Sequence, residues 1–125
     1  MKVLSQSQVL LLHKQLIKRY GGSEGLRDSG LLDAALNGPF QTFDNAELYP
    51  SLLEKAARLA YSLVCDHPFI DGNKRIGAHA MLVFLAINGV QLTYMDQEMI
   101  DLFLNLAAGK ISSEDLLHWL QTHVV

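Results

Sequence analysis

The sequence predicts an all-α fold: a compact single domain of about six helices over residues 1–125. Three observations lead to this prediction. Apolar residues recur at intervals of three and four along most of the chain. Glycine, proline and capping residues separate these segments at lengths typical of helices, and no segment alternates long enough to form a long strand. Since 50% of the residues are hydrophobic, the chain can bury a core without disulfides or metal ions.

The N-terminal third of the chain carries two predicted helices. Ser5 or Ser7 can cap the first, and Gly21 with Gly22 ends it, because glycine is the usual residue just past a helix C-terminus. The apolar positions of this helix recur at helical spacing: Val9, Leu12, Leu16 and Tyr20. A shorter helix over residues 30–36 follows, and an Asn-Gly-Pro sequence ends it.

A loop and a third helix occupy the middle of the chain. Residues 39–50 have no clear period and are expected to form a loop, with room for a short extended flap. Pro50 and Ser51 open the third helix. Its apolar stripe consists of Leu52, Ala56, Leu59, Ala60 and Leu63. His67 and Pro68 end this helix, because the residue before a proline is disfavoured in the helical conformation.

Three further helices are expected in the C-terminal half. The fourth covers about residues 73–88, and its dense apolar part is too short to span a bilayer of about 30 Å, so it is expected in the protein core. The fifth covers about residues 97–108 and has one apolar face: Ile100, Phe103 and Leu106. The sixth begins after Ser112 or Ser113 and is anchored by Leu116, Leu117, Trp119 and Leu120.

Composition and charge narrow the class of protein. The formal net charge of −3 argues against direct nucleic-acid binding, which usually requires a basic stripe. Cys65 is the single cysteine, so no internal disulfide is possible and a reducing, cytoplasmic compartment is expected. The first residues lack the pattern of a signal peptide, and no membrane association is expected.

The segment richest in chemistry is His-Pro-Phe-Ile-Asp-Gly-Asn-Lys-Arg, residues 67–75, which lies between two strong helices. His67 can gain or lose a proton near neutral pH. Asp71 is a hard carboxylate, suited to a magnesium ion that also contacts phosphate. Gly72 allows the backbone to turn sharply and to approach a ligand closely. Together these residues suggest a catalytic turn.

The charges that follow this turn point to an anion. Unpaired backbone N–H groups at the start of the fourth helix form a natural phosphate site. Asn73 adds an amide there, and Lys74 and Arg75 add two cations that oppose the helix dipole by a few tenths of a kcal/mol each. A bound phosphate would explain this unfavourable placement. Ordinary turn chemistry and solvated cations are the structural alternative. On either interpretation, Phe69 and Ile70 are expected to anchor the loop in the core.

These nine residues resemble the Fic signature, His-x-Phe-x-Asp/Glu-Gly-Asn-Gly/Lys-Arg. The similarity extends along the chain and is closest to the Doc ("death on curing") branch of the family. The segments that carry it are 20–22, 25–28, 31–36, 54–57 and 84–89. The resemblance implies a Fic-type helical bundle.

The resemblance also implies a role for each motif residue. His67 would be the general base that takes a proton from a target hydroxyl, and Asp71 would hold Mg²⁺. Phe69 would anchor the loop in the core. The residues that would bind the phosphates of ATP are Gly72, Asn73, Lys74 and Arg75.

Lys74 bears on the reaction type, because the commoner Fic pattern has glycine there and transfers AMP. Doc-like proteins have this lysine, and the implied reaction is transfer of the γ-phosphoryl group of ATP to a threonine or serine hydroxyl. The implied target is elongation factor Tu, whose modification would block translation. Gly72 stands where some Doc sequences have alanine, so transfer of AMP remains an alternative. A catalytically silent helical module that binds a protein partner is an alternative of a different class.

Regulation is expected from a second protein. Many Fic proteins resemble one another in an inhibitory motif, Ser/Thr-x-x-x-Glu-Gly/Asn. Glu24 is the only glutamate followed by glycine or asparagine, and Tyr20 stands four residues before it, so the motif is absent. The Doc branch implies an antitoxin that inhibits in trans, as in type II toxin–antitoxin systems. Outside the motif, His79 and Cys65 are interpreted as structural residues.

Overall fold

The computed structural model describes residues 1–125 and confirms the all-α prediction. Six α-helices account for most of the chain, together with one short 3-10 helix and a two-stranded sheet. The elements in chain order are α1 (Gln6–Tyr20), α2 (Ser29–Asn37), η1 (Gly38–Phe40), β1 (Thr42–Phe43), β2 (Ala46–Glu47), α3 (Leu52–Asp66), α4 (Asn73–Ile87), α5 (Asp96–Ala107) and α6 (Ser113–His123).

Side-chain caps fix the starts of four helices, three of them at serines that the sequence suggests. Ser5, Asp28, Ser51 and Ser112 precede α1, α2, α3 and α6, and each accepts a hydrogen bond from a backbone N–H in the first turn. Such a bond satisfies one of the donors that the start of a helix leaves unpaired. The predicted helix boundaries are therefore correct to within about two residues.

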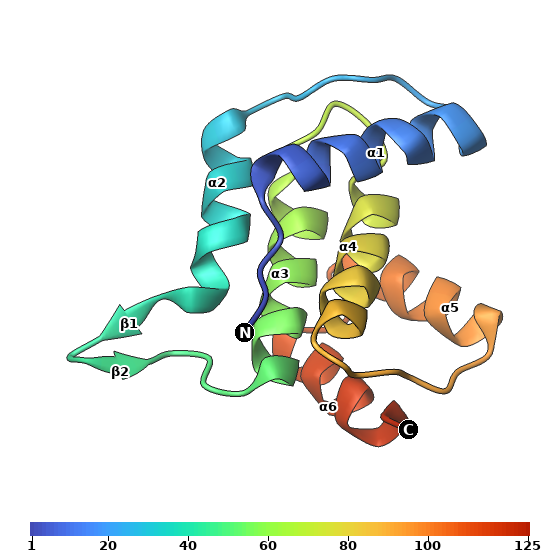
Figure 1. Ribbon diagram of the computed structural model, residues 1–125. Helices are drawn as coiled ribbons and strands as arrows, with labels where there is room; N and C mark the ends of the chain where they lie inside the picture. Colours follow the sequence, from blue (N-terminus) through green and yellow to red (C-terminus); the bar gives the residue numbers. More distant parts are fainter.

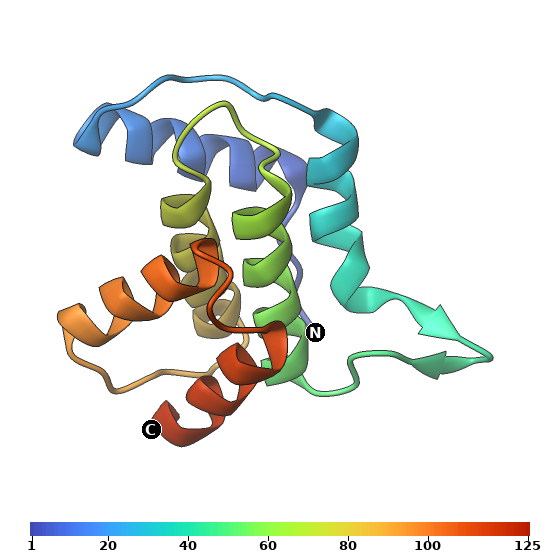
Figure 2. The ribbon, with the colours of Figure 1, turned by 180° about the vertical axis from the view of Figure 1, so that it is seen from behind.

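Helix α3 is the centre of the molecule. Figures 1 and 2 show α3 beside α4, with α2 on one flank, α6 against its N-terminal half, and α1 across one end of the α3–α4 pair. The connection between α1 and α2 and the connection between α3 and α4 lie at that same end (Figure 1). Residues far apart in the sequence therefore meet above the start of α4.

The core is one cluster of 21 buried side chains, mostly from α3 to α6. Two side chains predicted to face the core are exposed in the structure. Ile100 is 53% exposed, because α5 turns Met99 and Leu102 inward with Phe103. Ile70, expected in the core beside Phe69, is 58% exposed, because the loop before α4 buries Phe69 and directs the next side chain outward.

The segment 39–50 forms the short flap that its lack of helical period allowed. Strands β1 and β2 are antiparallel, and Asp44 and Asn45 form the turn with φ values of 52° and 63°. Lys55, buried in α3, holds the base of the flap through Glu47, with Nζ 3.1 Å from Oε1, and through the carbonyl of Tyr49. The flap projects from the bundle in both views (Figures 1 and 2).

None of the helices combines the length and the apolar character that crossing a bilayer would require.

Candidate active site

The motif loop, residues 67–72, lies against the connection between α1 and α2. The backbone N–H groups of Arg27 and Asp28 both donate to the carbonyl of Pro68, at 2.7 and 3.0 Å. Ile70 N donates in return to Gly25 O at 3.1 Å. This short antiparallel contact fixes the motif loop on a second segment of the chain.

Arg27 also holds the end of α3. Its Nε donates to the carbonyl of His67 at 2.6 Å, and its Nη2 donates to the carbonyl of Asp66 at 2.8 Å. Carbonyls in the last turn of a helix have no partner within the helix, so a guanidinium satisfies two of them at once. Arg27 thus caps the C-terminus of α3, and Asp28 caps the N-terminus of α2. Both residues have structural roles.

His67 ends α3 in the left-handed conformation, with φ 52° and ψ 59°. This conformation is uncommon for a residue other than glycine, and such residues concentrate at functional sites. Its imidazole is exposed, and Nδ1 lies 3.5 Å from Nδ2 of Asn73. The ring therefore stands at the edge of the motif loop, where a substrate hydroxyl can approach it.

Asn73, which the sequence suggests for phosphate binding, has its side chain only 8% exposed. Its Oδ1 accepts from Phe69 N at 2.9 Å, and its Nδ2 donates to Phe69 O at 3.0 Å. The amide thus closes the loop on itself across four residues. What Asn73 offers a ligand in this arrangement is its backbone N–H.

The start of α4 presents free donors. Ile76 N is the first amide to bond back into the helix, to Gly72 O at 2.9 Å. The N–H groups of Asn73, Lys74 and Arg75 have no acceptor in the protein. Gly72 precedes them with φ 76°, a conformation that glycine adopts without strain.

Asp71 is exposed, and its carboxylate is held by two backbone donors. Oδ2 accepts from Ser23 N at 3.0 Å, and Oδ1 accepts from Gly72 N at 2.8 Å. These two hydrogen bonds, that of Ser23 first, lower the pKa of the Asp71 carboxyl below its usual range. The group is therefore anionic and oriented.

The donor set fits magnesium bound together with a nucleotide. No group of three or more histidine, cysteine, aspartate or glutamate side chains gathers anywhere in the structure. A magnesium ion at Asp71 would take its other ligands from phosphate oxygens and water, which is how this ion is commonly held beside nucleotides.

Lys74 and Arg75 complete the site. Neither forms an ion pair with a carboxylate, and the Arg75 guanidinium lies 4.6 Å from the centre of the Tyr20 ring, at the end of α1. The two cations border an open hollow of about 390 Å³. The residues that line it are His67, Ile70, Asp71, Gly72, Asn73, Lys74 and Arg75.

Phe69 anchors the loop, as the resemblance to the Fic signature implies: it is 1% exposed. It packs against His13 of α1, with ring centres 3.8 Å apart and planes within 10°. His13 also lies 2.7 Å, through Nε2, from the carbonyl oxygen of Asp71. Sequence reasoning missed His13, although a polar residue at helical spacing between Val9 and Ile17 could have drawn attention to it.

Comparison with known proteins agrees with this geometry. Residues 3–85 match the Fic/DOC family.

The chain belongs to the Fic/Doc family.

Two relatives of this Fic/Doc chain illustrate the match. Over 73 residues, 58% of the chain, it is 49% identical to "Toxin Doc" of Mycolicibacterium smegmatis (strain ATCC 700084 / mc(2)155), of which this match spans 56%. Over 112 residues, 90% of the chain, it is 35% identical to "Protein kinase doc" of Escherichia phage P1, of which this match spans 87%. The motif loop lies within the family match.

Other polar residues of the Fic/Doc domain lie outside this site. His79, on α4, is half-buried and does not line the hollow. Burial raises the pKa of the Cys65 thiol, and the neighbouring Asp66 raises it further. A thiol in this setting is not activated as a nucleophile.

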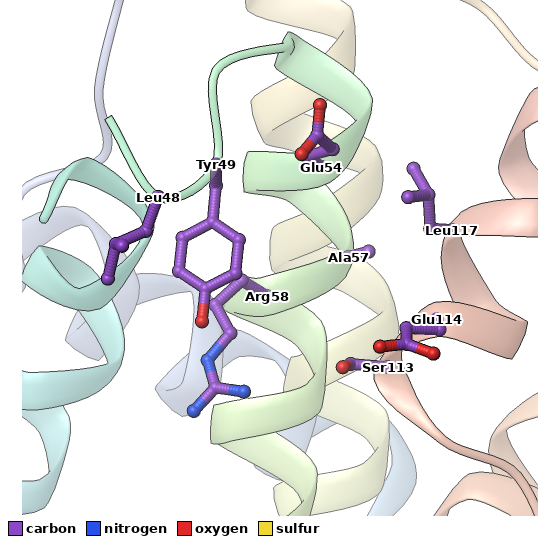
Figure 3. A pocket seen from close by; sticks show the side chains of 8 residues that line it. All are labelled: Leu48, Tyr49, Glu54, Ala57, Arg58, Ser113, Glu114 and Leu117. Carbon is purple, nitrogen blue, oxygen red and sulfur yellow. The ribbon is translucent and has the colours of Figure 1, made fainter. Parts of the chain in front are cut away.

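A second hollow, of about 380 Å³, lies beside the flap and the start of α6 (Figure 3). Two of its charged side chains are already engaged: the Arg58 guanidinium lies 5.6 Å from the Tyr49 ring centre, and Glu54 caps α3. Its lining residues are Leu48, Tyr49, Glu54, Ala57, Arg58, Ser113, Glu114 and Leu117. None of them belongs to the motif, so the chemistry is assigned to the hollow at the start of α4.

Proposed function

We propose that this chain is a Doc-like toxin of a type II toxin–antitoxin system. It transfers the γ-phosphoryl group of ATP to a threonine or serine hydroxyl of a target protein. The observation that carries this proposal is the start of α4, where three unpaired backbone N–H groups and two unpaired cations face one hollow beside His67 and Asp71. The names of the two relatives, a toxin and a protein kinase, support it.

The start of α4 suits a polyphosphate. The N-terminus of a helix carries a partial positive charge, and its free N–H groups point outward. Lys74 and Arg75 add two full charges, and neither forms an ion pair with a carboxylate of the protein. This concentration of positive charge favours the binding of phosphate oxygens and stabilises the charge that they carry during transfer.

Asp71 is the residue that would hold Mg²⁺. When bound, the ion would neutralise charge on the phosphate oxygens and keep them in place. The two hydrogen bonds from Ser23 and Gly72 keep the carboxylate anionic and directed, so it meets the ion without reorganisation.

His67 acts as the general base. Its exposed imidazole accepts the proton of the target hydroxyl as that oxygen attacks the γ-phosphorus, and ADP departs with the electrons of the broken P–O bond. Asn73, which reaches Nδ1 at 3.5 Å, and Arg27, which binds the carbonyl, hold the residue in place. The protein contributes mainly position and charge, which is what phosphoryl transfer requires.

Lys74 favours phosphoryl transfer over AMP transfer. It is the second residue of α4, exposed, and without a partner in the structure, so its ammonium group can reach the terminal phosphates. A substrate bound through those phosphates presents the γ-phosphorus to the base.

Two protein partners follow from this function. The target is elongation factor Tu in the cytoplasm, whose modification blocks translation. The inhibitor is a cognate antitoxin that acts in trans, because the chain lacks the inhibitory motif of many Fic proteins.

Expression in a bacterial host tests this function. Wild type, His67→Ala and His118→Ala are induced in parallel, and modified proteins are identified by mass spectrometry. His118 is an exposed histidine on α6, remote from the motif, and serves as the matched control. We expect phosphate on a threonine or serine of elongation factor Tu with wild type and His118→Ala, and none with His67→Ala. An AMP adduct would contradict the kinase assignment, and equal modification by His67→Ala would remove His67 from the mechanism.

A further inference from the structure

Helix α1 contains one buried polar side chain, His13. It is 3% exposed and lies on the inner face of the helix between Val9 and Ile17, which are buried as well. Burying a polar group without a hydrogen bond is costly, so apolar residues are usual at such positions. The histidine is therefore explained by what it contacts.

Both contacts of His13 are with the motif loop. Its ring stacks on Phe69 at 3.8 Å, and its Nε2 is 2.7 Å from the carbonyl oxygen of Asp71. Because a carbonyl can only accept, Nε2 carries the proton. No buried side-chain nitrogen lacks a partner in the structure, so Nδ1, which has no partner in the protein, is not fully enclosed. His13 also lines a hollow of about 160 Å³ together with Lys14 and Glu24.

Three hydrogen bonds fix Asp71. The side-chain oxygens accept from Ser23 N and Gly72 N, whereas the main-chain carbonyl accepts from His13. The first two donors belong to the backbone and occur with any side chain at those positions. His13 is the only one of the three donors that the sequence supplies as a side chain.

We propose that His13 is a positioning residue of the active site: from behind the motif loop it fixes the direction in which Asp71 presents its carboxylate to magnesium. The inference rests on the proposed function. His13 touches neither the nucleotide nor the metal, and it acts through the backbone of Asp71 and the ring of Phe69. Groups that orient a metal ligand in this way typically contribute about 10-fold to 100-fold to metal affinity or activity.

Two substitutions separate the contacts of His13. His13→Phe keeps a ring that can stack on Phe69 but removes the donor to Asp71. His13→Gln keeps an N–H donor at a similar reach but removes the ring. His118→Phe, on the surface of α6, is the control for a histidine-to-phenylalanine change.

The first measurement needs no metal or nucleotide. Amide resonances of Ser23 and Gly72 are recorded by NMR for each variant, since both N–H groups bind the Asp71 carboxylate. We expect both resonances to shift in His13→Phe, and to remain close to wild type in His13→Gln and His118→Phe.

The second measurement is calorimetric titration of ATP at a series of magnesium concentrations. We expect His13→Phe to raise the magnesium concentration for half-maximal ATP binding by about 10-fold or more. ATP binding without magnesium should change little, because Lys74, Arg75 and the N–H groups of α4 are intact. His13→Gln should restore most of the magnesium dependence.

Unchanged resonances together with wild-type magnesium dependence in His13→Phe would overturn the inference. If His13→Phe does not fold, the test rests on His13→Gln. Wild-type magnesium dependence of ATP binding in this variant supports the role of the donor. An about 10-fold weaker response to magnesium, with an unshifted amide resonance of Gly72, contradicts it. Failure of wild type to transfer phosphate would reject the proposed function but leave the NMR result for His13 standing.

Discussion

At the scale of single residues, side chain and backbone have different roles in the motif. The side-chain amide of Asn73 is hydrogen-bonded to the backbone of Phe69, and its main-chain N–H is free to bind a ligand. Asp71 shows the opposite division, because its carbonyl is held by His13 while its carboxylate remains exposed. A sequence motif identifies the residues but does not indicate whether the side chain or the backbone of each residue contacts the ligand.

Asn73→Ala is predicted to destabilise the protein and to weaken ATP binding as a consequence. The change leaves the buried N–H and carbonyl of Phe69 without partners, and each such group costs about 1–3 kcal/mol. Chemical denaturation should report a lower free energy of unfolding, and titration with ATP should report weaker binding.

Asn88→Ala is the matched control for Asn73→Ala, because Asn88 uses its amide in the same way on Lys2, at the far end of α4. The hydrogen bonds with Lys2 are exposed, so water can replace much of what the substitution removes. ATP binding should not change. Wild-type stability of Asn73→Ala with ATP binding abolished would instead assign the Asn73 amide directly to phosphate.

At the scale of elements, the position of the site depends on the close crossing of α3 and α4. Gly77 of α4 faces α3, where a Cβ atom would lie 2.5 Å from Cγ2 of Val64 and 3.3 Å from the carbonyl oxygen of Ala60. Val64 is buried and branched at Cβ, so it cannot easily turn aside. The start of α4 is therefore held at a fixed distance from His67 at the end of α3.

Gly77→Ala is predicted to lower stability although alanine is the better helix former. The gain in helix propensity is about 1 kcal/mol, whereas overpacking a tight core contact costs about 1–3 kcal/mol. Thermal unfolding should show a lower Tm for Gly77→Ala, and Val64→Ala in the same chain should suppress part of the loss.

Gly38→Ala is the control for the change from glycine to alanine. Gly38 has an ordinary helical φ of −53°, and apart from its chain neighbours no atom lies within 4 Å of the added Cβ. The helical conformation before Pro39 is somewhat less favourable for alanine than for glycine, but no packed neighbour is displaced, so this variant should lose less stability than Gly77→Ala. An equal loss of Tm in Gly38→Ala and Gly77→Ala would contradict the steric explanation.

The C-terminal helices are joined by Glu98, whose carboxylate accepts from Met95 N and contacts His123 Nε2 at 2.9 Å. The hydrogen bond from Met95, and then that from His123, lower the pKa of Glu98. A carboxyl whose pKa is lower in the folded state stabilises the fold when ionised. This contribution is present above about pH 4.3 and is lost as the pH falls through the lowered pKa.

Glu98→Gln should therefore be less stable than wild type at neutral pH, and the difference in Tm should shrink as the pH falls below about 4. Thermal unfolding between pH 7 and pH 3 measures both chains. Glu114→Gln is the control, because Glu114 also lies in the first turn of a helix but its carboxylate accepts no hydrogen bond. A constant difference in Tm across this range would contradict the assignment.

At the scale of the whole molecule, the sequence predicts the helices well because their signals are local. Ser5, Ser51 and Ser112 cap helices where the pattern suggests, and Asp28 caps α2. Local patterns fail where tertiary packing decides, as for Ile100, which fits an apolar face by spacing but lies outward.

The candidate active site is predictable only in part, for the same reason. Residues 67–75 are contiguous, so their pattern is visible in the sequence. The supports of the loop come from segments 40 to 60 residues away: Arg27 from the α1–α2 connection, Ser23 from the same segment, and His13 from α1. Nothing local marks these residues as neighbours of the motif, and the fold alone brings them together.

Phosphoryl transfer by this chain can be tested directly with purified chain, magnesium, a bacterial lysate, and ATP labelled at either the α- or the γ-phosphate. We expect label to reach a protein from the γ-position alone, and we expect His67→Ala to transfer none. Label from the α-position would identify an AMP transferase despite Lys74. No transfer from either position by wild type would contradict a catalytic role for the hollow at the start of α4 and favour a silent binding module.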